Sequence, residues 1–534
     1  MTNIFLHTVK VNPNLPSQNP VPSHPHETDT MGENENATVT TKKKTSKTLL
    51  TLLTEPFQWI QKLSSQLNPT FVIGVFLIYG IGQGFSGSLF KVVADYYWKD
   101  VQKIQPFTVQ LYVGFYFIPW VLKPLWGILT DAFPVRGYRR RPYFIISGVI
   151  GAVSAAVIAF AGNLAAVAAL MCFVGVSASL AIADVTIDAC IARNSIEVRE
   201  LAPDLQSLCG FCSGAGALVG YLASGFFVHR LGPQESLGLM ALSPALTIVL
   251  GFVIYENRTS GSHIEKKQVD DLTKHKISQA VESVGMKIRS MYQTMLYPHV
   301  WKPSLYMFLA LALNVTTHEG HFYWYTDPKA GPAFSQEFVG VIYAIGAVAS
   351  LIGVLIYHKA LKDYPFRDLV FYAQLLYGIS GVLDLIFILR WNLVIGIPDY
   401  FFVVIEESAT RITSKIRWMP MMVLSTQLCP LGIEGTFFAL LMCIDSIGAL
   451  LSRWGGGVLL RVLHITRTDF TNLWLAVLIR DMLRFATLAL VFLVPKTDQY
   501  EELLPFEVSG KNTSDKVDEE ETLELVPING KTEV

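Results

Sequence analysis

Long apolar stretches alternate with short polar segments along most of the chain, and each stretch is long enough to cross a membrane as a helix. A helix needs about 20 mostly apolar residues to span the hydrocarbon core. The stretches lie near residues 70–90, 108–130, 142–161, 164–191, 205–228, 237–255, 301–320, 337–357, 368–389, 396–424, 434–460 and 472–494. We therefore predict an all-α membrane protein with 12 transmembrane helices.

A polar segment divides these stretches into two sets of six. Residues 256–299 hold seven Lys and Arg side chains, which is too much charge for a span. Two six-helix halves joined by a basic loop are the plan of the major-facilitator fold. The expected parts are a disordered cytosolic tail (1–66), an N-terminal six-helix bundle (67–255), a cytosolic central loop (256–299), a C-terminal six-helix bundle (300–495) and a disordered acidic cytosolic tail (496–534).

A weak internal repeat supports the two halves. A shift of 232 residues aligns Gly216 with Gly448 and Gly225 with Gly457. The aligned glycines fall in equivalent spans of the two halves, as expected when one six-helix unit is repeated.

The basic residues also predict an orientation. The loop after the second span holds Arg136, Arg139, Arg140 and Arg141. Basic loops stay on the cytosolic side of a membrane, so this loop, the central loop and both termini should be cytosolic. The first 66 residues carry acidic side chains and no arginine, which disfavours a plastid transit peptide. The plasma membrane, the vacuole and the plastid envelope stay open as locations.

Composition narrows the class of protein further. The chain is 51% hydrophobic and only 16% charged, with a net charge of −1, which gives no reason to expect a nucleic-acid partner. The motif His318-x-x-His321 at the end of the seventh span is typical of a polar and aromatic belt at the membrane surface. We find no metal-ligand set and no nucleophile with its base and acid, so we expect neither a cofactor nor an enzyme.

Charged residues inside the spans are the sharpest functional signals, because a charge in hydrocarbon is costly. Asp184 and Asp188 are four residues apart, so both carboxylates lie on one face of the fourth span. Two carboxylates this close in a low dielectric would not both stay ionised, which makes the pair a candidate proton-coupling group. Alternatively, one or both pair with Arg193.

The tenth span carries Glu406, Glu407 and Arg411. Glu407 and Arg411 have the spacing of a helical ion pair, which would be structural. Alternatively, Arg411 lies near mid-membrane and holds a substrate carboxylate. Both interpretations stay open.

The eleventh span carries three further candidates for substrate or proton binding. Glu434 falls in the first turn, where a carboxylate suits the helix dipole. Asp445 and Arg453 lie deeper and, eight residues apart, on similar faces.

A candidate gating latch follows the second span. Asp131 at the helix end faces the run Arg139, Arg140 and Arg141, and a carboxylate facing arginines makes charge-assisted hydrogen bonds that can open in one access state. The alternative is a plain basic cytosolic loop.

Several of these segments together resemble the folate-biopterin transporter family, and most closely its plant branch. The resemblance rests on residues 123–142, on Asp184 and Asp188, on residues 418–420 and on the Cys-Pro-x-Gly-x-Glu block within residues 427–441. It implies a major-facilitator transporter of folates or pterins coupled to protons. In such a protein a pteridine would stack on aromatic rings and bond to an acidic side chain, and a folate tail would need a cation such as Arg411 or Arg453.

The sequence thus predicts a secondary active transporter that works by alternating access in a lipid bilayer, functional as a monomer, with folates or pterins and protons as its partners. Two alternatives stay open. The same fold could carry another amphipathic organic solute, or the protein could sense a solute without transporting it.

Overall fold

The computed structural model describes residues 61, 63–133, 135–162, 164–197, 202–256, 289, 291–429 and 434–497. The expected tail 496–534 and tail 1–66 fall almost entirely outside these residues, as does most of the central loop 256–299. Nearly all of the described chain is helical, as the hydropathy pattern predicts.

The N-terminal half holds six helical spans, several of them built from consecutive segments. Proline at the first or second position starts many of these segments, where its missing N–H leaves no bond unmade. In chain order they are α2 (Pro69–Val75), η1 (Phe76–Ser86), α3 (Gly87–Tyr96) and η2 (Tyr97–Val101); α4 (Pro106–Val121) and α5 (Lys123–Ala132); α6 (Arg141–Phe160); α7 (Ala166–Glu197); α8 (Ala202–Leu231); and α9 (Pro233–Leu239) with α10 (Leu242–Val253).

The C-terminal half repeats this plan with one short extra helix, α16 (Trp391–Val394). Its other segments are α12 (Pro298–Ala312) and α13 (His318–Tyr325); α14 (Gln336–Ile356) and η4 (Tyr357–Leu361); α15 (Phe366–Ile388); α17 (Asp399–Gln427); α18 (Glu434–Val462); and α19 (Leu473–Ala486) with η5 (Thr487–Leu493).

Nine helices of the described residues are long and apolar enough to cross a membrane. The other three expected spans fall short for identifiable reasons. The seventh is broken between α12 and α13, so neither piece is long enough. Any 18 consecutive residues of α17, or of α19 with η5, contain at least three charged side chains. The count of 12 spans is consistent with these helices and stays a prediction.

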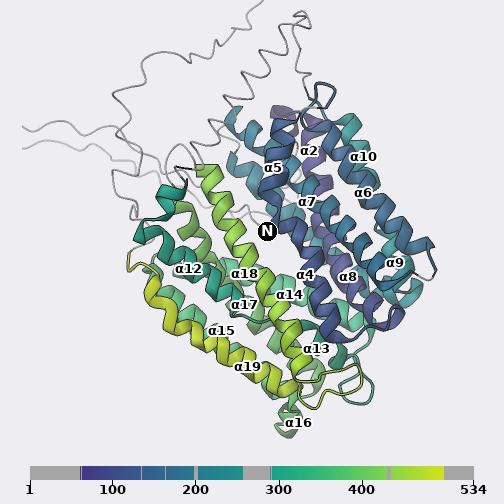
Figure 1. Cartoon of the computed structure of the whole chain (residues 1–534), viewed down its shortest axis with the longest axis vertical. Coiled ribbons are helices and arrows are strands. Elements are labelled where there is room, and N and C mark those ends of the chain that lie inside the picture. The colour runs from purple at the N-terminus through teal and green to yellow at the C-terminus, as the bar shows by residue number, and fades with distance from the viewer. Residues whose placement is uncertain are drawn as a thin grey trace, which may run out of the picture.

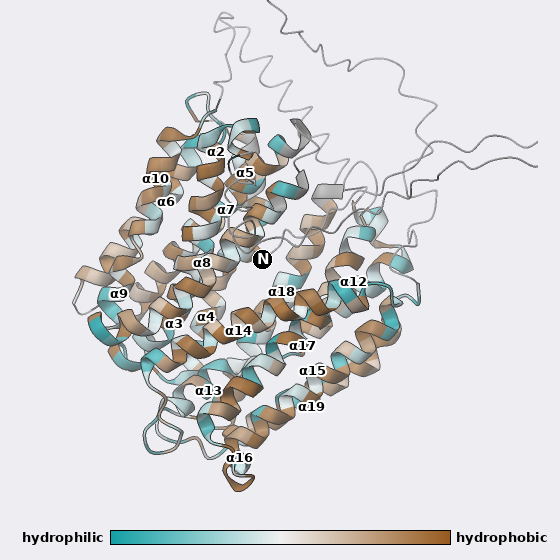
Figure 2. Cartoon of the chain, turned by 180° about the vertical axis from the view of Figure 1, so that it is seen from behind, coloured by the Kyte–Doolittle hydropathy of each residue, from teal (hydrophilic) through white to brown (hydrophobic). Residues whose placement is uncertain are grey.

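The outer surface of both halves is apolar. Large hydrophobic side chains such as Phe160, Val394 and Phe401 are among the many that are exposed. Figure 2 shows apolar residues along the outer helices and hydrophilic ones gathered in the loops at the two ends. A water-soluble protein rarely exposes apolar patches of this extent, so this surface faces lipid.

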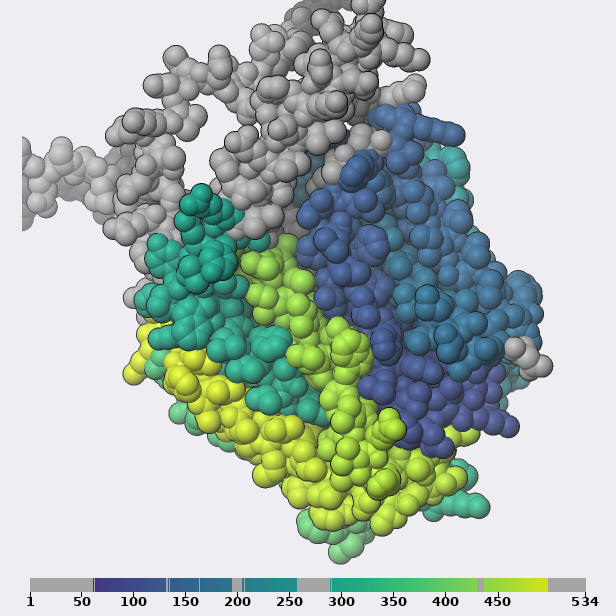
Figure 3. Space-filling model, in the orientation of Figure 1, coloured from purple at the N-terminus to yellow at the C-terminus, as the bar shows by residue number. Residues whose placement is uncertain are grey.

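The two halves lie side by side and pack mainly through two helix pairs, α8 with α14 and α4 with α18, with α13 also against α4 (Figure 1). In the space-filling view α18 lies directly against the N-terminal half (Figure 3). Glycine permits both approaches: a Cβ on Gly225 would lie 2.6 Å from Glu337 Cα, and one on Gly457 would lie 2.7 Å from Leu111 Cγ. These are two of the glycines aligned by the 232-residue shift, so the repeated positions make equivalent contacts between the halves.

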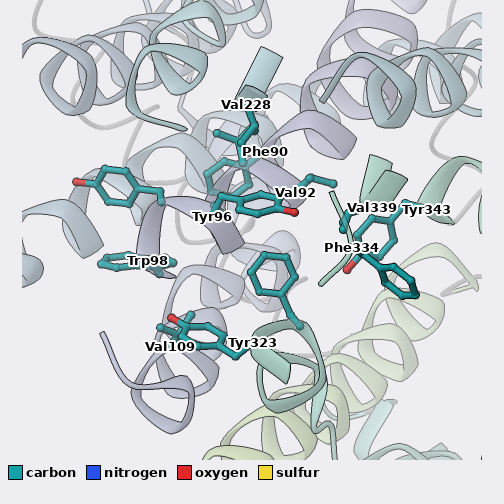
Figure 4. Packing of buried hydrophobic residues seen from close by; sticks show 14 of the residues in the cluster. Phe90, Val92, Tyr96, Trp98, Val109, Val228, Tyr323, Phe334, Val339 and Tyr343 are labelled. Atoms are coloured by element: carbon teal, nitrogen blue, oxygen red, sulfur yellow. The ribbon is translucent and has the colours of Figure 1, made fainter. Parts of the chain in front are cut away.

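A large aromatic cluster joins the halves at one end. It draws Phe90 and Tyr96 from α3, Tyr323 from α13 and Tyr343 from α14 (Figure 4). Tyr96 meets Phe322 edge to face across the interface, with ring centroids 4.9 Å apart. We call this end, which bears residues 102–105, 326–335 and 463–472, the packed end.

The contact between the first span and α8 leaves no room for a side chain at Gly84. A Cβ there would lie 2.7 Å from Ser213 O and 2.9 Å from Gly216 Cα, and this backbone cannot move aside. Gly84→Ala should therefore destabilise the protein by about 1–3 kcal/mol, the usual range for overpacking. Thermal unfolding of the purified protein in detergent measures this, with Gly214→Ala as the matched control, since a Cβ at Gly214 meets nothing within 4 Å. Equal melting temperatures for the two variants would contradict the close approach.

Candidate transport site

The first polar site lies within the N-terminal half, where Asp184 of α7 accepts from Lys123 Nζ and from Gln83 Nε2. The chain turns at Leu122, between α4 and α5, which places Lys123 at the start of α5. The Lys123 ammonium also sits 4.7 Å from the centre of the Trp120 ring. Asp184 is almost fully buried and Lys123 keeps 27% of its side chain exposed, so the cation is the accessible member of the pair.

Asp188, one turn further along α7, accepts a hydrogen bond from the Tyr79 hydroxyl. The two carboxylates therefore have different partners, although they share one helix face as expected. Beside them lies a cavity of about 10 Å³, lined in part by Gln83, Ser179 and Ser243, which has room for a single water molecule.

The second polar site follows α17. Arg411 Nε donates to Glu407 Oε1 at 2.7 Å, so the expected ion pair is present. Glu407 fits because Gly346 of α14 has no side chain, and a Cβ there would lie 2.6 Å from Glu407 Oε1. Arg411 still exposes 38% of its side chain, and within the described residues only its Nε has a hydrogen-bonded partner. The outer edge of its guanidinium therefore remains available for a carboxylate.

A buried ionic network fills the core of the C-terminal half. Arg480 of α19 pairs with Asp384 of α15 and, at 3.0 Å, with its neighbour Asp481. Arg484 reaches Asp481 at 3.4 Å. Glu406 of α17 lies in hydrogen-bonding reach of Asp384, which ties the tenth span to this network.

The same network supports the break in the seventh span, between α12 and α13. Arg484 Nε donates to Asn314 Oδ1 at 3.0 Å, and the Thr316 N–H donates to Ser452 O at 3.2 Å. Ser452 Oγ in turn donates to Asn314 O at 2.5 Å. Backbone groups freed by a broken helix inside a membrane must be paired in this way. Discontinuous helices of this kind often border binding sites in transporters.

In the eleventh span the candidates have separate surroundings. Arg453 stacks on Phe117 of α4, with its guanidinium carbon 3.8 Å from the ring centre, and so spans the interface between the halves. Asp445 borders a cavity of about 20 Å³ with Arg417 and Tyr306, and its Oδ1 is buried without a hydrogen bond among the described residues. The structure does not describe the side chain of Glu434.

The arginines of the expected latch contact their own half. Backbone N–H groups of Arg139, Arg140 and Arg141 donate to the carboxylate of Glu256, at the end of the sixth span, over 2.7–3.1 Å. Arg140 Nη1 donates to Thr130 Oγ1 at 2.8 Å. The side chain of Asp131 lies outside the described part of the chain, so the latch stays a prediction.

A third polar group lies at the packed end and differs from the expected surface belt. Glu319 is fully buried and Tyr323 nearly so, because both face the N-terminal half rather than the membrane surface. Asp95, His318 and Glu319 offer ligand atoms within 4.8 Å of one another. His318 Nε2 already meets Asp95 Oδ2 at 3.0 Å and the Tyr343 hydroxyl at 3.3 Å, so this nitrogen is engaged in hydrogen bonds rather than free for a metal.

Sequence reasoning missed several residues of these sites. Lys123, Asp384 and Arg480 each interrupt an apolar stretch, and the rule applied to Asp184 would have found them. Asp95 and Gln83 carry no such signal, because a polar residue near a span end or among glycines is common.

Solved structures define the class of this fold. The chain resembles a variant of the nucleoside transporter NupG with a TM-score of 0.57 and 13% identity, over 79% of this chain and 99% of that one. A D-xylose–proton symporter matches with a TM-score of 0.53 and 13% identity, over 80% of this chain and 98% of that one. The fold is therefore that of the major-facilitator transporters, and the lipid-facing helices make this a multi-pass membrane protein.

Sequence comparison then gives the family: the chain belongs to the BT1 family, whose model matches residues 83–517. Probable folate-biopterin transporter 6 of Arabidopsis thaliana is 61% identical over 88% of this chain and 91% of its own length. Probable folate-biopterin transporter 2 of the same plant is 48% identical over 87% and 91%. The folate-biopterin transporter of a Synechocystis strain is 30% identical over 80% and 82%. These relatives are transporters and not enzymes, as the sequence predicts.

The Lys123–Asp184 pair can be tested by a double-mutant cycle. Lys123→Ala leaves Asp184 buried without its cation, and breaking such a pair typically costs about 3–5 kcal/mol. Lys123→Ala together with Asp184→Ala removes both charges and should be more stable than Lys123→Ala alone. Thermal unfolding of Lys123→Ala, Asp184→Ala and the double variant measures the coupling between the two residues. Strictly additive effects would mean that the pair contributes nothing.

Proposed function

We propose that this protein is a proton-coupled transporter of folates or pterins that works by alternating access. The substrate assignment rests on the sequence relationship, since relatives that match 80–88% of this chain are named as folate-biopterin transporters. The fold supports the transport mode, because the two halves are separate helical units that meet through limited helix pairs.

The orientation that we propose places the packed end away from the cytosol. At the opposite end, Glu256 binds the loop that carries Arg139, Arg140 and Arg141, and Phe366 N donates to Thr497 O at 3.1 Å. The described flanks of the central loop and of the C-terminal tail therefore lie at the end with the basic loops. Cytosolic termini follow from the positive-inside rule.

Arg411 is the residue that we assign to the acidic tail of a folate. The pairing with Glu407 fixes its position through Nε, and the remaining edge can bind a carboxylate with two parallel hydrogen bonds. Arg453 is a second cation between the halves, but its stacking on Phe117 already holds one face of the guanidinium. Asp184 is neutralised by Lys123, so we assign this pair to the substrate path rather than to proton storage.

The substrate assignment is tested by uptake of labelled folate and labelled pterin into a host that lacks folate transport. We expect accumulation of at least one of these compounds above the vector control, and we expect it to fall several-fold when the proton gradient is collapsed. A well-expressed protein that takes up neither compound would refute the assignment. Uptake that is indifferent to the gradient would refute only the coupling.

The role of Arg411 is tested by comparing two substrates. Arg411→Ala should raise the KM for folate by about tenfold or more, the size of a lost charge-assisted pair, and leave transport of a tail-less pterin within about twofold. Glu407→Gln is the matched control, because it removes the ion pair but keeps the guanidinium. An equal loss of both substrates in Arg411→Ala would mean that the ion pair is only structural.

A second candidate function keeps the fold and changes the cargo to another amphipathic organic solute. The part-exposed guanidinium of Arg411 on α17 would suit any anionic solute with an apolar body. A sensor that binds without transport is the other alternative. Flux of labelled solute into liposomes that contain the purified protein separates transport from sensing.

A further inference from the structure

The cluster of Asp95, His318 and Glu319 is not used by the substrate site described above. Asp95 lies on α3 in the N-terminal half, and the other two lie on α13 in the C-terminal half. The cluster therefore bridges the halves, near Tyr96 and Phe322 of the aromatic cluster in sequence. Asp95 and Glu319 are buried, with exposures of 3% and 0%.

Glu319 is the unusual member, because both of its carboxylate oxygens are buried without any hydrogen-bond partner among the described residues. The backbone N–H of Glu319 donates to Gln110 Oε1 at 3.2 Å. The Gln110 side chain therefore presents its acceptor oxygen to this residue, and not its N–H donors. A charged carboxylate in such a place would cost several kcal/mol. A neutral carboxyl group avoids that cost.

The other charged and titratable groups around Glu319 do not compensate for two negative charges. On α3 they are Asp95 and Lys91, and the Lys91 ammonium is turned to the Tyr343 ring of α14, 4.5 Å from its centre. On α4 there is Tyr116, with Arg453 of α18 beyond it. On α13 itself there are Tyr323 and His318, and His318 is already bonded to Asp95.

We propose that Asp95, His318 and Glu319 form the binding site of the proton that drives transport, and that the two halves pack together at this end only when the site holds that proton. This inference rests on the proton-coupled transport proposed above. A hydronium ion in the water of the open site gives a proton to the Glu319 carboxylate. One O–H bond of the hydronium breaks, one O–H bond forms on Glu319, and the products are a neutral carboxyl group and a water molecule. Closure then excludes water from a group that no longer needs it.

The position of the cluster explains why proton binding and closure would be linked. Separating the halves at this end parts Asp95 from His318 and lets water reach Glu319. A deprotonated Glu319 is therefore favoured in the open state, and a protonated one in the packed state. A ligand shifts such an equilibrium by its difference in affinity for the two states.

The first test is transport by the full chain reconstituted in liposomes, with labelled folate as the probe. Glu319→Gln has the shape of the protonated carboxyl group and cannot release a proton. It should exchange labelled for unlabelled folate within about twofold of the wild-type rate, and its accumulation driven by a proton gradient should fall to the level without a gradient. Gradient-driven accumulation that persists in Glu319→Gln would overturn the proposal. Loss of accumulation by the wild-type protein on adding a metal chelator at constant pH would also overturn it, because the cluster would then hold a metal ion.

Glu337→Gln is the matched control for this experiment. Glu337 of α14 meets His229 of α8 at 3.2 Å, so it too belongs to a carboxylate–histidine pair between the halves at the same end. The side chains of His229 and Glu337 are both exposed, so water can stabilise the charge on Glu337. Gradient-driven accumulation should be unchanged in this variant, and a loss equal to that in Glu319→Gln would overturn the assignment to the buried cluster.

A second test needs no substrate, so it still decides the matter if folate is not the cargo. Spin labels at Gly162→Cys and Lys329→Cys, in a protein whose six native cysteines are replaced, report the distance between the halves at the packed end. We expect the short-distance population to grow as the pH falls, and to be independent of pH once Glu319→Gln is added. A pH dependence that survives this change would overturn the proposal.

A variant that fails to fold does not end the test. Asp95→Asn neutralises the other carboxylate and should also abolish gradient-driven accumulation while exchange continues. Glu319→Asp keeps a titratable group and should retain accumulation with a shifted pH profile. Coupling that is normal in Asp95→Asn and absent in Glu319→Asp would contradict a shared proton site.

Discussion

The structure depends on one constraint, which is that a charge inside a low-dielectric protein interior must be paired or neutral. In the C-terminal half, Arg480 lies between Asp384 and Asp481. In the N-terminal half, Asp184 lies between Lys123 and Gln83. Each group joins helices that are far apart in the sequence, so the ion pairs fix which helix faces turn inward.

The same constraint acts on the backbone. The break between α12 and α13 frees N–H and C=O groups that lipid cannot satisfy. Ser452 supplies partners for the Asn314 C=O and the Thr316 N–H, and Arg484 binds the Asn314 side chain, so the break depends on α18 and α19 being in place. The result is a short helix, α13, that is held firmly at its start and carries Glu319 in its first turn against the other half. The polar core of the C-terminal half thereby positions a residue at the interface.

Hydropathy and charge spacing predicted the class of fold well, because a span must be apolar over a fixed length whatever its neighbours are. They also predicted the Glu407–Arg411 pair, since both residues belong to one helix and helical geometry alone brings them together. The partners of Asp184 could not be predicted in this way. Lys123 is 61 residues away, and only the packing of α5 against α7 selects it. The burial of Glu319 likewise depends on contact between the halves, so its sequence position at a span end indicated a surface belt instead.

In the mechanism that we propose, a single proton acts on the contacts between the halves. Gly225 and Gly457 place backbone against neighbouring helices, and such close packing is made in one relative position or not at all. The aromatic cluster between the halves favours the packed position. Each large side chain that loses contact with water contributes about 1.5–3 kcal/mol. A buried negative charge opposes it by several kcal/mol. A negative charge on Glu319 is thus comparable in free energy with the burial of two or three aromatic rings, which is the size of effect that the proposed mechanism requires.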